Sequence, residues 1–372
     1  MSWGVATQNG VSVSLASIVS LSCGATEFSP ASLFTSGVQG AWYDPSDYST
    51  LFQDSAGTTP VTAVEQPVGK MLDKSGNNNH ATQATTASRP VLRARYNNFV
   101  GTATLATQNV TTLAATYKLS FTGTGSITLS GTATGTYSAG TNAITCTAGT
   151  LTATVSGTVT NADLRLSSTA TSMPAYQRVT TATDYDAFGF LPYLALDGTD
   201  DSMTSSSVNF SATDKMAVVA GVTKLTDTGD GNIVELSSNV NLNSGAFYFW
   251  APEAVGLKYT MLSRGTAAIN VNQRATTSST TYNAPSTVVL SGVMNISGDS
   301  NELRLNATSI NTATGDQGTG NYGNYPLYIG RRGGSTVPFN GRIYQMVVCG
   351  KALSASELAS TEAYVNTKTG AY

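Results

Sequence analysis

The sequence is poor in charged residues. Only 11% of its 372 residues are Asp, Glu, Lys or Arg, against roughly 25% in an ordinary globular protein. Thr, Ser, Ala and Gly take their place, and this composition favours strands and turns over exposed helices. The formal net charge is -3, and the sequence contains no evident cluster of Lys and Arg of the kind that binds nucleic-acid phosphates. We therefore expect no nucleic-acid partner.

Long hydrophobic runs are also missing. Apolar runs such as Met216–Val222 are far shorter than the ~20 residues that a membrane-spanning helix needs, so membrane insertion is not expected. The apolar, Ser-rich stretch Val11–Cys23 resembles the core of a secretory signal, but no Lys or Arg precedes Lys70. Because such a signal begins with a basic region, we expect residues 1–38 to be an N-terminal arm or tether.

The scarcity of histidine and cysteine limits the possible chemistry. The single histidine, His80, lies in a polar run and has no evident partner within its own segment, which argues against a nucleophilic triad. Cys23, Cys146 and Cys349 are odd in number and widely spaced, so they predict reduced, buried thiols and not a disulfide framework. No Cys/His spacing typical of zinc sites is present.

Period-two patterns dominate the chain. Between residues 97 and 168, Tyr117, Leu119 and Phe121 alternate with polar residues and Gly residues punctuate the runs, which predicts short strands and turns. After residue 191, Met216–Val222 predicts a buried strand and Phe247–Trp250 a half-exposed aromatic strand. Many short strands at this spacing indicate a sandwich or jelly roll.

One helix is predicted, near the C-terminus. Ser354 and Glu357 have the spacing of a capping box, in which each side chain binds the other residue's backbone N–H. Leu358, Thr361 and Val365, with the stem of Lys368, would lie along one face. We expect this helix to pack across the sandwich edge.

Three segments resemble a known family. Residues 40–83 contain WYDPSDYSTLFQDSAGTTPV and then DKSGNNNHATQ, residues 193–203 read YLALDGTDDSM, and residues 341–358 read GRIYQMVVCGKALSASEL. They resemble the opening, a strand and turn, and the closing strand and helix of the laminin-G/concanavalin A-like lectin module in virion structural proteins of tailed bacteriophages. The resemblance implies an all-β fold, namely a concanavalin A-like jelly-roll sandwich with an inserted smaller β-sandwich and a short C-terminal helix.

The long interval between the first two segments implies the insertion. We expect the lectin-like sandwich in residues 39–93 and 186–372, and a β-sandwich resembling a carbohydrate-binding module in residues 94–185. Tyr176–Asp186, which also resembles phage proteins of this kind, would be the return linker. The arm, residues 1–38, would attach to other virion proteins.

Two sets of candidate ligands follow from this resemblance. No cofactor is required, but lectin-like sandwiches of this kind often bind Ca²⁺ through hard oxygen ligands of loops; the candidates are Asp73, Asn77, Asn79, Asp197 and Asp200, which are also ordinary turn residues. A glycan would stack on exposed aromatic rings and bind Arg forks where the sugar is acidic. These candidates are Tyr248, Trp250, Tyr259, Tyr322, Tyr325, Arg331 and Arg332, with residues 320–325 the most loop-like. The alternative is that these aromatic rings are core.

We expect binding and not catalysis. No ExDxxE-like string places two carboxylates on one strand for hydrolysis of a sugar bond, and Asp200 and Asp201 fall in a predicted turn. The leading hypothesis is a tail-associated adhesin or fibre-type protein, assembled into the virion in the host cytoplasm, that binds host surface glycans. A head decoration protein of the same fold is the alternative, and a polysaccharide-degrading enzyme ranks third.

A homo-oligomer is expected. Virion attachment sites are symmetric, and weak binding sites gain from multivalency. The sequence shows no heptad pattern, so a coiled-coil stalk is not predicted.

Overall fold

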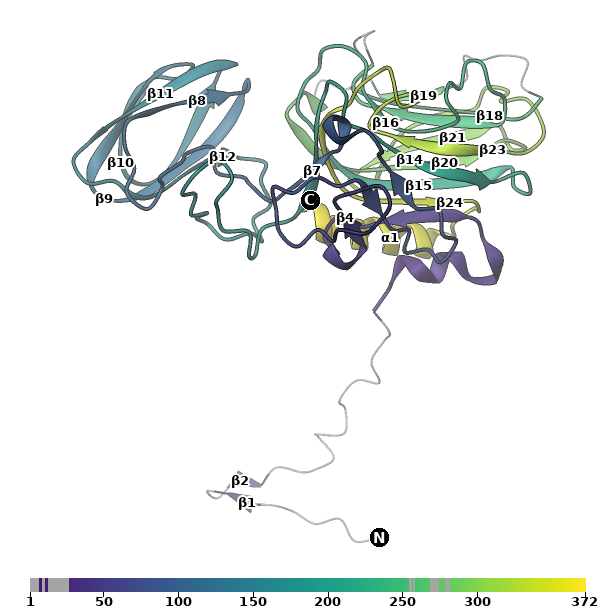
Figure 1. The fold of residues 1–372 in the computed structure, drawn as a ribbon, viewed down its shortest axis with the longest axis horizontal. Coiled ribbons are helices and arrows are strands. Elements are labelled where there is room, and N and C mark those ends of the chain that lie inside the picture. Colours follow the sequence, from purple (N-terminus) through teal and green to yellow (C-terminus); the bar gives the residue numbers. More distant parts are fainter. Residues whose placement is uncertain are drawn as a thin grey trace.

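The computed structural model describes residues 27–253, 256, 258–267 and 282–372, together with the strands β1 (Thr7–Gln8), β2 (Val11–Ser12) and β19 (Arg274–Thr277). Two large antiparallel sheets form a sandwich, and a smaller antiparallel sheet stands beside it (Figure 1). The predicted all-β sandwich with a smaller inserted β unit and a short C-terminal helix is confirmed. No described helix is long and apolar enough to cross a membrane.

The first large sheet is organised around β24 (Asn340–Cys349). On one side β24 pairs with β15, and on the other it pairs with β13 at residues 340–343 and with β3 at residues 346–349. Across the sheet the strands are β22 (Thr308–Ala313), β21 (Ser300–Leu305), β20 (Ser286–Asn295), β15 (Lys215–Lys224), β24, β13 (Tyr193–Asp197) and β7 (Val91–Arg93), with β3 (Gly40–Tyr43) beside β24. The central position of β15 explains its continuous apolar sequence, because both of its faces are covered.

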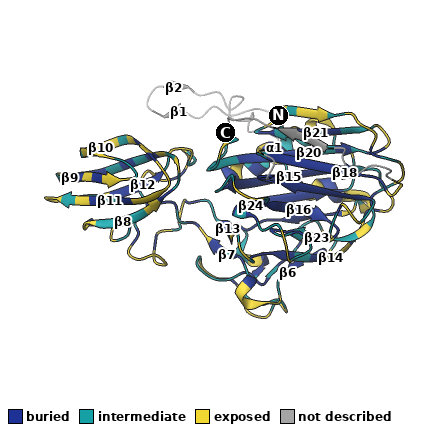
Figure 2. Ribbon diagram, turned by 90° about the horizontal axis from the view of Figure 1, so that it is seen from above, coloured by how far each residue is buried: buried dark blue, intermediate teal, exposed yellow. Residues whose placement is uncertain are grey.

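The second large sheet faces the first across the main core. In order its strands are β19, β18 (Tyr259–Arg264), β17 (Ala246–Trp250), β16 (Asn232–Leu236), β23 (Asn324–Ile329), β14 (Met203–Asn209), β6 (Ala81–Thr82), β5 (Lys70–Met71) and β4 (Leu51–Phe52). Side chains such as Val218, Phe249 and Leu290 fill the space between the sheets, and Figure 2 shows the sandwich strands largely buried.

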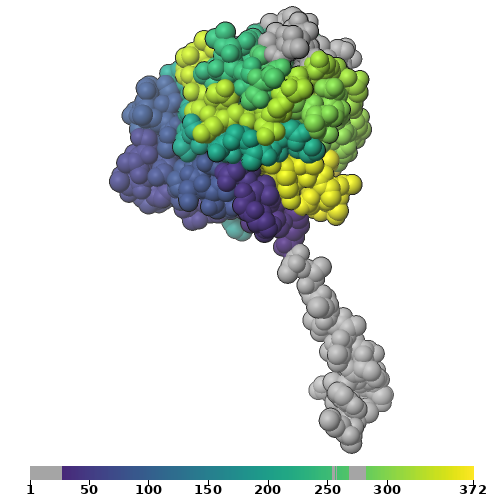
Figure 3. Space-filling view, turned by 90° about the vertical axis from the view of Figure 1, so that its right-hand side faces the viewer, coloured from purple at the N-terminus to yellow at the C-terminus, as the bar shows by residue number. Residues whose placement is uncertain are grey.

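Helices cover the outer face of the first sheet. The α-helix α1 (Ala355–Thr369) buries Thr361 and Val365 there, and the 3₁₀ helix η2 (Pro30–Gly37) adds Leu33 and Phe34 to the same cluster. Figure 3 shows this purple segment beside the yellow C-terminal region. Two further short 3₁₀ helices are η3 (Tyr48–Thr50) and η4 (Thr86–Ser88). The last third of the predicted arm therefore packs on the sandwich, while residues 1–26, including Cys23, lie outside the described residues apart from β1 and β2.

The predicted capping box is confirmed. The Ser354 hydroxyl accepts a hydrogen bond from the Glu357 N–H at 3.2 Å, and the Glu357 carboxylate accepts one from the Ser354 N–H at 2.8 Å. These two contacts satisfy N–H groups that a helix start leaves without partners. The helix is also tied to the sheet, because Glu362 accepts from the Arg304 guanidinium at 2.8 Å.

The smaller sheet has a core of its own. Its strands are β8 (Gln108–Thr112), β9 (Ala115–Gly131), β10 (Gly135–Cys146), β11 (Gly149–Ser156) and β12 (Thr160–Leu166). Tyr117, Leu119 and Phe121 are buried in it, as their alternation predicted, and so is the free Cys146. The long strand β9 changes partner from β12 to β11 beyond residue 122. Gly123, with φ +110°, lies at this change, where a Cβ would come within 2.2 Å of the Thr158 carbonyl oxygen.

A buried polar junction joins the smaller sheet to the sandwich. The Asn97 amide donates to the carbonyls of Ala162 (2.8 Å) and Gln177 (2.9 Å) and accepts from the Leu164 N–H. The Gln177 amide accepts from the Asn97 N–H and donates to the Ala94 carbonyl. Asn97 and Gln177 are fully buried, and breaking such a bond would leave a buried polar group unsatisfied. These bonds tie residues 94–97, which follow β7 of the sandwich, to β12 of the smaller sheet.

Candidate functional site

Most of the predicted glycan-binding aromatic residues are core residues. Tyr259 and Tyr322 are 0% exposed, and the Tyr322 hydroxyl lies 2.5 Å from that of Ser263 inside the protein. Tyr248 and Trp250 are buried and stacked, with 4.5 Å between ring centroids. The prediction of exposed stacking rings is wrong for these four residues, and β17 is not half-exposed, because β17 and β18 lie inside the second sheet with both faces covered.

The two predicted arginine ligands, Arg331 and Arg332, make contacts within the protein that stabilise its fold. Arg332 forms a buried ion pair with Glu235 at 2.8 Å, and its guanidinium lies 4.3 Å from the Trp250 ring centroid. Arg331 donates to the carbonyls of Asp200 and Ser335. A glycan role stays a prediction for Arg331 and for the half-buried Tyr325.

Three predicted calcium ligands, Asp73, Asn77 and Asn79, form hydrogen bonds that hold their loop against the start of β3. Asp73 accepts from the Trp42 N–H at 2.8 Å and from the Asn79 N–H at 3.0 Å. The amides of Asn77 and Asn79 donate to the Gly40 carbonyl at 3.2 and 2.7 Å. The side chains of Asp73, Asn77 and Asn79 thus already have hydrogen-bond partners, and these contacts hold the loop against β3.

His80 belongs to the same hydrogen-bonded loop. Its Nδ1 accepts a hydrogen bond from the Asp73 N–H at 3.0 Å, so the expectation that His80 has no partner in its own segment is wrong. Burial lowers the pKa of His80, and the nearby Lys70 lowers it further. A neutral imidazole suits its role as an acceptor.

The other predicted calcium ligands, Asp197 and Asp200, meet Asp201, and oxygens of the three carboxylates lie within 4.8 Å of one another. Asp197 accepts from the Thr199 N–H at 2.7 Å, and Asp200 accepts from the Ser88 hydroxyl at 2.8 Å. Burial and the charges of Asp197 and Asp200 raise the pKa of Asp201 to about 7. Asp73 is not part of this cluster, and calcium binding stays a prediction.

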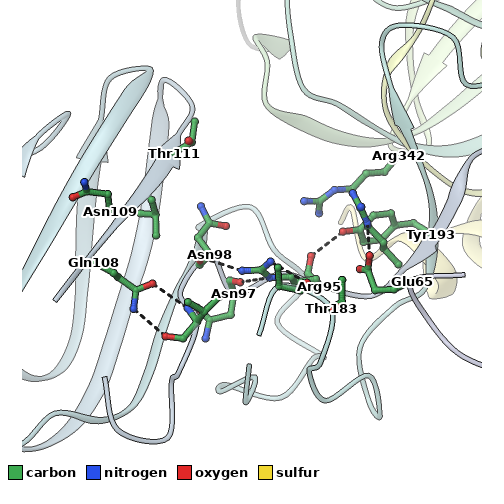
Figure 4. A pocket seen from close by; sticks show the side chains of 14 residues that line it. Glu65, Arg95, Asn97, Asn98, Gln108, Asn109, Thr111, Thr183, Tyr193 and Arg342 are labelled. Atoms are coloured by element: carbon green, nitrogen blue, oxygen red, sulfur yellow. Dashed lines mark hydrogen bonds and ion pairs between the residues drawn. The ribbon is translucent and has the colours of Figure 1, made fainter. Parts of the chain in front are cut away.

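A polar groove lies where the smaller sheet meets the sandwich (Figure 4). We call it the junction groove, a hollow of about 460 Å³ whose wall includes Arg93, Arg95, Asn98, Asn109, Tyr193 and Arg342. It adjoins a hollow of about 600 Å³ beside Asp197 and Asp201 and one of about 190 Å³ beside Tyr96. Arg342 lines all three.

Strand register brings these side chains together. Arg93 of β7 lies opposite Tyr193 of β13, and Ala195 of β13 lies opposite Arg342 of β24. Residues opposite one another in antiparallel strands, and residues two apart in one strand, point to the same face. Arg93, Tyr193 and Arg342 therefore share the outer face, toward the smaller sheet, while their neighbours Leu92, Leu194 and Ile343 enter the main core.

Arg342 is held between aromatic rings. Its guanidinium carbon lies 4.5 Å from the Tyr193 ring centroid and 5.3 Å from that of Tyr96, distances typical of cation–π contacts. Burial alone would lower the pKa of Arg342, but the phenol groups of Tyr193, Tyr344 and Tyr96 raise it overall. Arg342 is therefore a permanent cation. Within the described residues no carboxylate forms an ion pair with it.

The other two arginines of the junction groove are engaged. Arg93 pairs with Glu65 at 3.1 Å, and Glu65 also accepts from the Tyr185 hydroxyl at 2.7 Å. Arg95 donates to backbone carbonyls, including those of Asn97 and Ala182. Among the described residues that line the groove, one carboxylate thus faces three guanidinium groups, which makes it positive in a chain of net charge -3.

The expectation that no basic cluster exists is therefore corrected. Arg89, Arg93 and Arg95 lie within seven residues of sequence, and this spacing was a readable sign of a local basic cluster. Arg342 adds to them only through strand pairing. None of the three groove arginines was among the predicted site residues.

Part of the chain is similar to a known protein family. The family model for the concanavalin A-like lectin/glucanases superfamily matches residues 197–359, the region that holds β14 to β24. No curated protein matches the chain in sequence. Arg342 lies inside the matched range, whereas Arg93, Arg95 and Tyr193 lie outside it.

Solved structures match in part. The binding domain of botulinum neurotoxin serotype D aligns with a TM-score of 0.36 and 12% identity, covering 48% of this chain and 43% of that chain. A carbohydrate-binding module, CBM40, of the Ruminococcus gnavus IT-sialidase, solved with α2,3-sialyllactose, aligns with a TM-score of 0.31 and 15% identity, covering 40% of this chain and 83% of that chain. The chain thus spans less than half the length of the neurotoxin domain.

Proposed function

We propose that this protein binds glycans without catalysis and that the junction groove is its ligand site. The observation that carries the proposal is the position of Arg342, a cation held by aromatic rings and paired with no carboxylate of the described residues, in a groove whose wall also includes the side-chain amides of Asn98 and Asn109. Proteins hold sugars with such donors and acceptors beside aromatic faces. The similarity of residues 197–359 to the concanavalin A-like lectin/glucanases superfamily supports glycan binding, because this superfamily includes lectins.

We further propose that this binding serves attachment of a tailed phage to its host. The support is the resemblance of residues 40–83, 193–203 and 341–358 to phage virion structural proteins. In this role the protein is a tail-associated adhesin, it associates with other virion proteins through its N-terminal region, and several copies act together.

A glycan array with the full chain, followed by calorimetry on the best ligands, tests the binding proposal. The variant Arg342→Gln should lose affinity, whereas Arg178→Gln should bind like the wild type. Arg178 is a matched control because it is an exposed arginine on the return linker, paired with Asp186 and absent from the groove wall. Equal binding by both variants would place the ligand elsewhere.

Antibody–gold labelling of intact virions tests the attachment role. Label on the tail tip or fibres supports an adhesin. Label spread over the head would replace that role with capsid decoration, and virions without label would remove the virion proposal.

A further inference from the structure

We propose that the ligand of the junction groove is an anionic sugar, whose carboxylate or sulfate group is bound by Arg342. This inference rests on the proposed glycan-binding function and adds the chemical class of the ligand. Three observations carry it: the charge imbalance of the groove, the guanidinium of Arg342 that no carboxylate of the described residues pairs with, and the fixed orientation of that guanidinium.

The charge imbalance follows from the partners of each group. Glu65 is the one carboxylate among the described groove residues, and it is committed to Arg93 at 3.1 Å and to the Tyr185 hydroxyl at 2.7 Å. Arg95 and Arg342 therefore keep uncompensated positive charge. A partly enclosed cleft lined by one sign of charge attracts ligands of the opposite sign.

The two uncompensated arginines have different roles. Arg95 gives its N–H groups to carbonyls of Asn97, Asn98 and Ala182, so it contributes charge to the groove but few free donors. The Arg342 guanidinium has the Tyr344 hydroxyl as a side-chain hydrogen-bond partner, whereas no carboxylate of the described residues pairs with it, and Figure 4 shows the guanidinium extending into the groove. A guanidinium offers paired N–H groups that match the two oxygens of a carboxylate or sulfate.

The orientation of Arg342 is set before a ligand arrives. Tyr193 and Tyr96 hold its guanidinium at 4.5 and 5.3 Å from their ring centroids. Each ring is itself fixed, because the Tyr193 hydroxyl donates to the Arg95 carbonyl at 2.8 Å and the Tyr96 hydroxyl donates to the Leu191 carbonyl at 2.7 Å. A donor fixed in this way loses little conformational freedom on binding.

The adjoining hollow, which lies beside Asp197 and Asp201, determines how the ligand is oriented in the groove. The charge of Asp197 repels an anionic group, and oxygens of both side chains can accept hydrogen bonds from sugar hydroxyls. The anionic group therefore lies at the Asn98 side of Arg342, and neutral hydroxyl-bearing parts of the same ligand extend toward the two aspartates.

Calorimetry with matched ligand pairs tests the inference in the wild-type chain. The probes are oligogalacturonate and its carboxyl-reduced neutral form, sialyllactose and lactose, and a sulfated and an unsulfated galactan oligosaccharide. We expect at least one anionic probe to bind on the order of 10- to 100-fold more tightly than its neutral partner, the range of a charge-assisted hydrogen-bonded pair. Which pair shows the difference distinguishes a carboxylate from a sulfate.

Variants locate the effect. Arg342→Gln should abolish the preference for the anionic partner, Arg342→Lys should keep part of it, and Arg178→Gln should keep all of it. Circular dichroism and urea midpoints establish that each variant folds, and the wild-type comparison stands even if Arg342→Gln does not fold. Equal affinity for both members of every pair, or a preference unchanged in a folded Arg342→Gln, would overturn the inference while leaving glycan binding intact. Absence of binding to every glycan on the array would overturn the proposed function itself.

Discussion

The substitution Asp201→Asn should make the protein more stable at neutral and higher pH. Asp201 is 9% exposed and shares its surroundings with Asp197 and Asp200, whose oxygens lie within 4.8 Å. Burial and these charges raise the pKa of Asp201 from 3.8 to about 7. In the folded state the carboxyl group therefore keeps its proton through a range in which the unfolded chain has lost it.

The sign and size of the effect follow from proton linkage. Between about pH 4 and pH 7 the folded state binds more protons than the unfolded state, so the free energy of unfolding falls as pH rises. The full shift of roughly 3 pKa units corresponds to about 4 kcal/mol. Because Asp201 borders a hollow open to water, we expect about half of this, ~2 kcal/mol. An Asn side chain does not titrate, and it keeps an oxygen that can accept the hydrogen bond from the Asp197 N–H. In the wild type Asp201 accepts this hydrogen bond at 3.1 Å.

Urea unfolding of the wild type and Asp201→Asn at about pH 4 and about pH 8 measures this difference. The two proteins should be nearly equally stable at the lower pH, and the variant should gain ~2 kcal/mol relative to the wild type at the higher pH. Asp184→Asn, a change at an exposed carboxylate, should show no such gain. A stability difference between Asp201→Asn and wild type that is the same at both pH values would refute the raised pKa.

Four further outcomes are expected. Phe249→Ala should cost about 3–5 kcal/mol in urea unfolding because it empties the main core, whereas Phe188→Ala, at a side chain 97% exposed, should stay within ~0.5 kcal/mol of the wild type. Ser354→Ala should cost about 1 kcal/mol through loss of the cap, and no loss would show that the helix start needs none. Burial raises the pKa of Cys349 to about 12, so iodoacetamide should label it, by peptide mass spectrometry, only after unfolding. Asn97→Ala should speed tryptic cleavage at the junction, and an unchanged rate would count against a rigid link.

The parts of the fold that depend on local chemistry could be predicted from the sequence. Ser354 and Glu357 form their capping box within one helical turn, and the alternation of Tyr117, Leu119 and Phe121 determines the buried face of β9 whatever strand pairs with it. Both patterns are readable because the interacting residues are close in sequence.

Burial of the aromatic residues could not be predicted in the same way. Nothing in the sequence around Tyr259 or Tyr322 shows that β18 lies beside β17, or that the Tyr322 ring meets Ser263. The junction groove depends still more on tertiary structure, because Arg93 and Arg342 are ~250 residues apart and meet only through the register of β7, β13 and β24. A one-residue slip in that register would turn Arg342 into the core.

The central position of β24 also sets an order for folding during protein synthesis. β3, β7 and β13 are made early, but β24, which joins them to β15, is not complete until residue 349 leaves the ribosome. The smaller sheet has all its strands between residues 108 and 166 and can pair them while most of the second half of the chain is still untranslated. Because domains fold as units as they emerge, we expect the inserted sheet to fold first. Until β24 is made, β3 and β13 lack the strand with which they pair, and the unfinished sandwich is prone to aggregation.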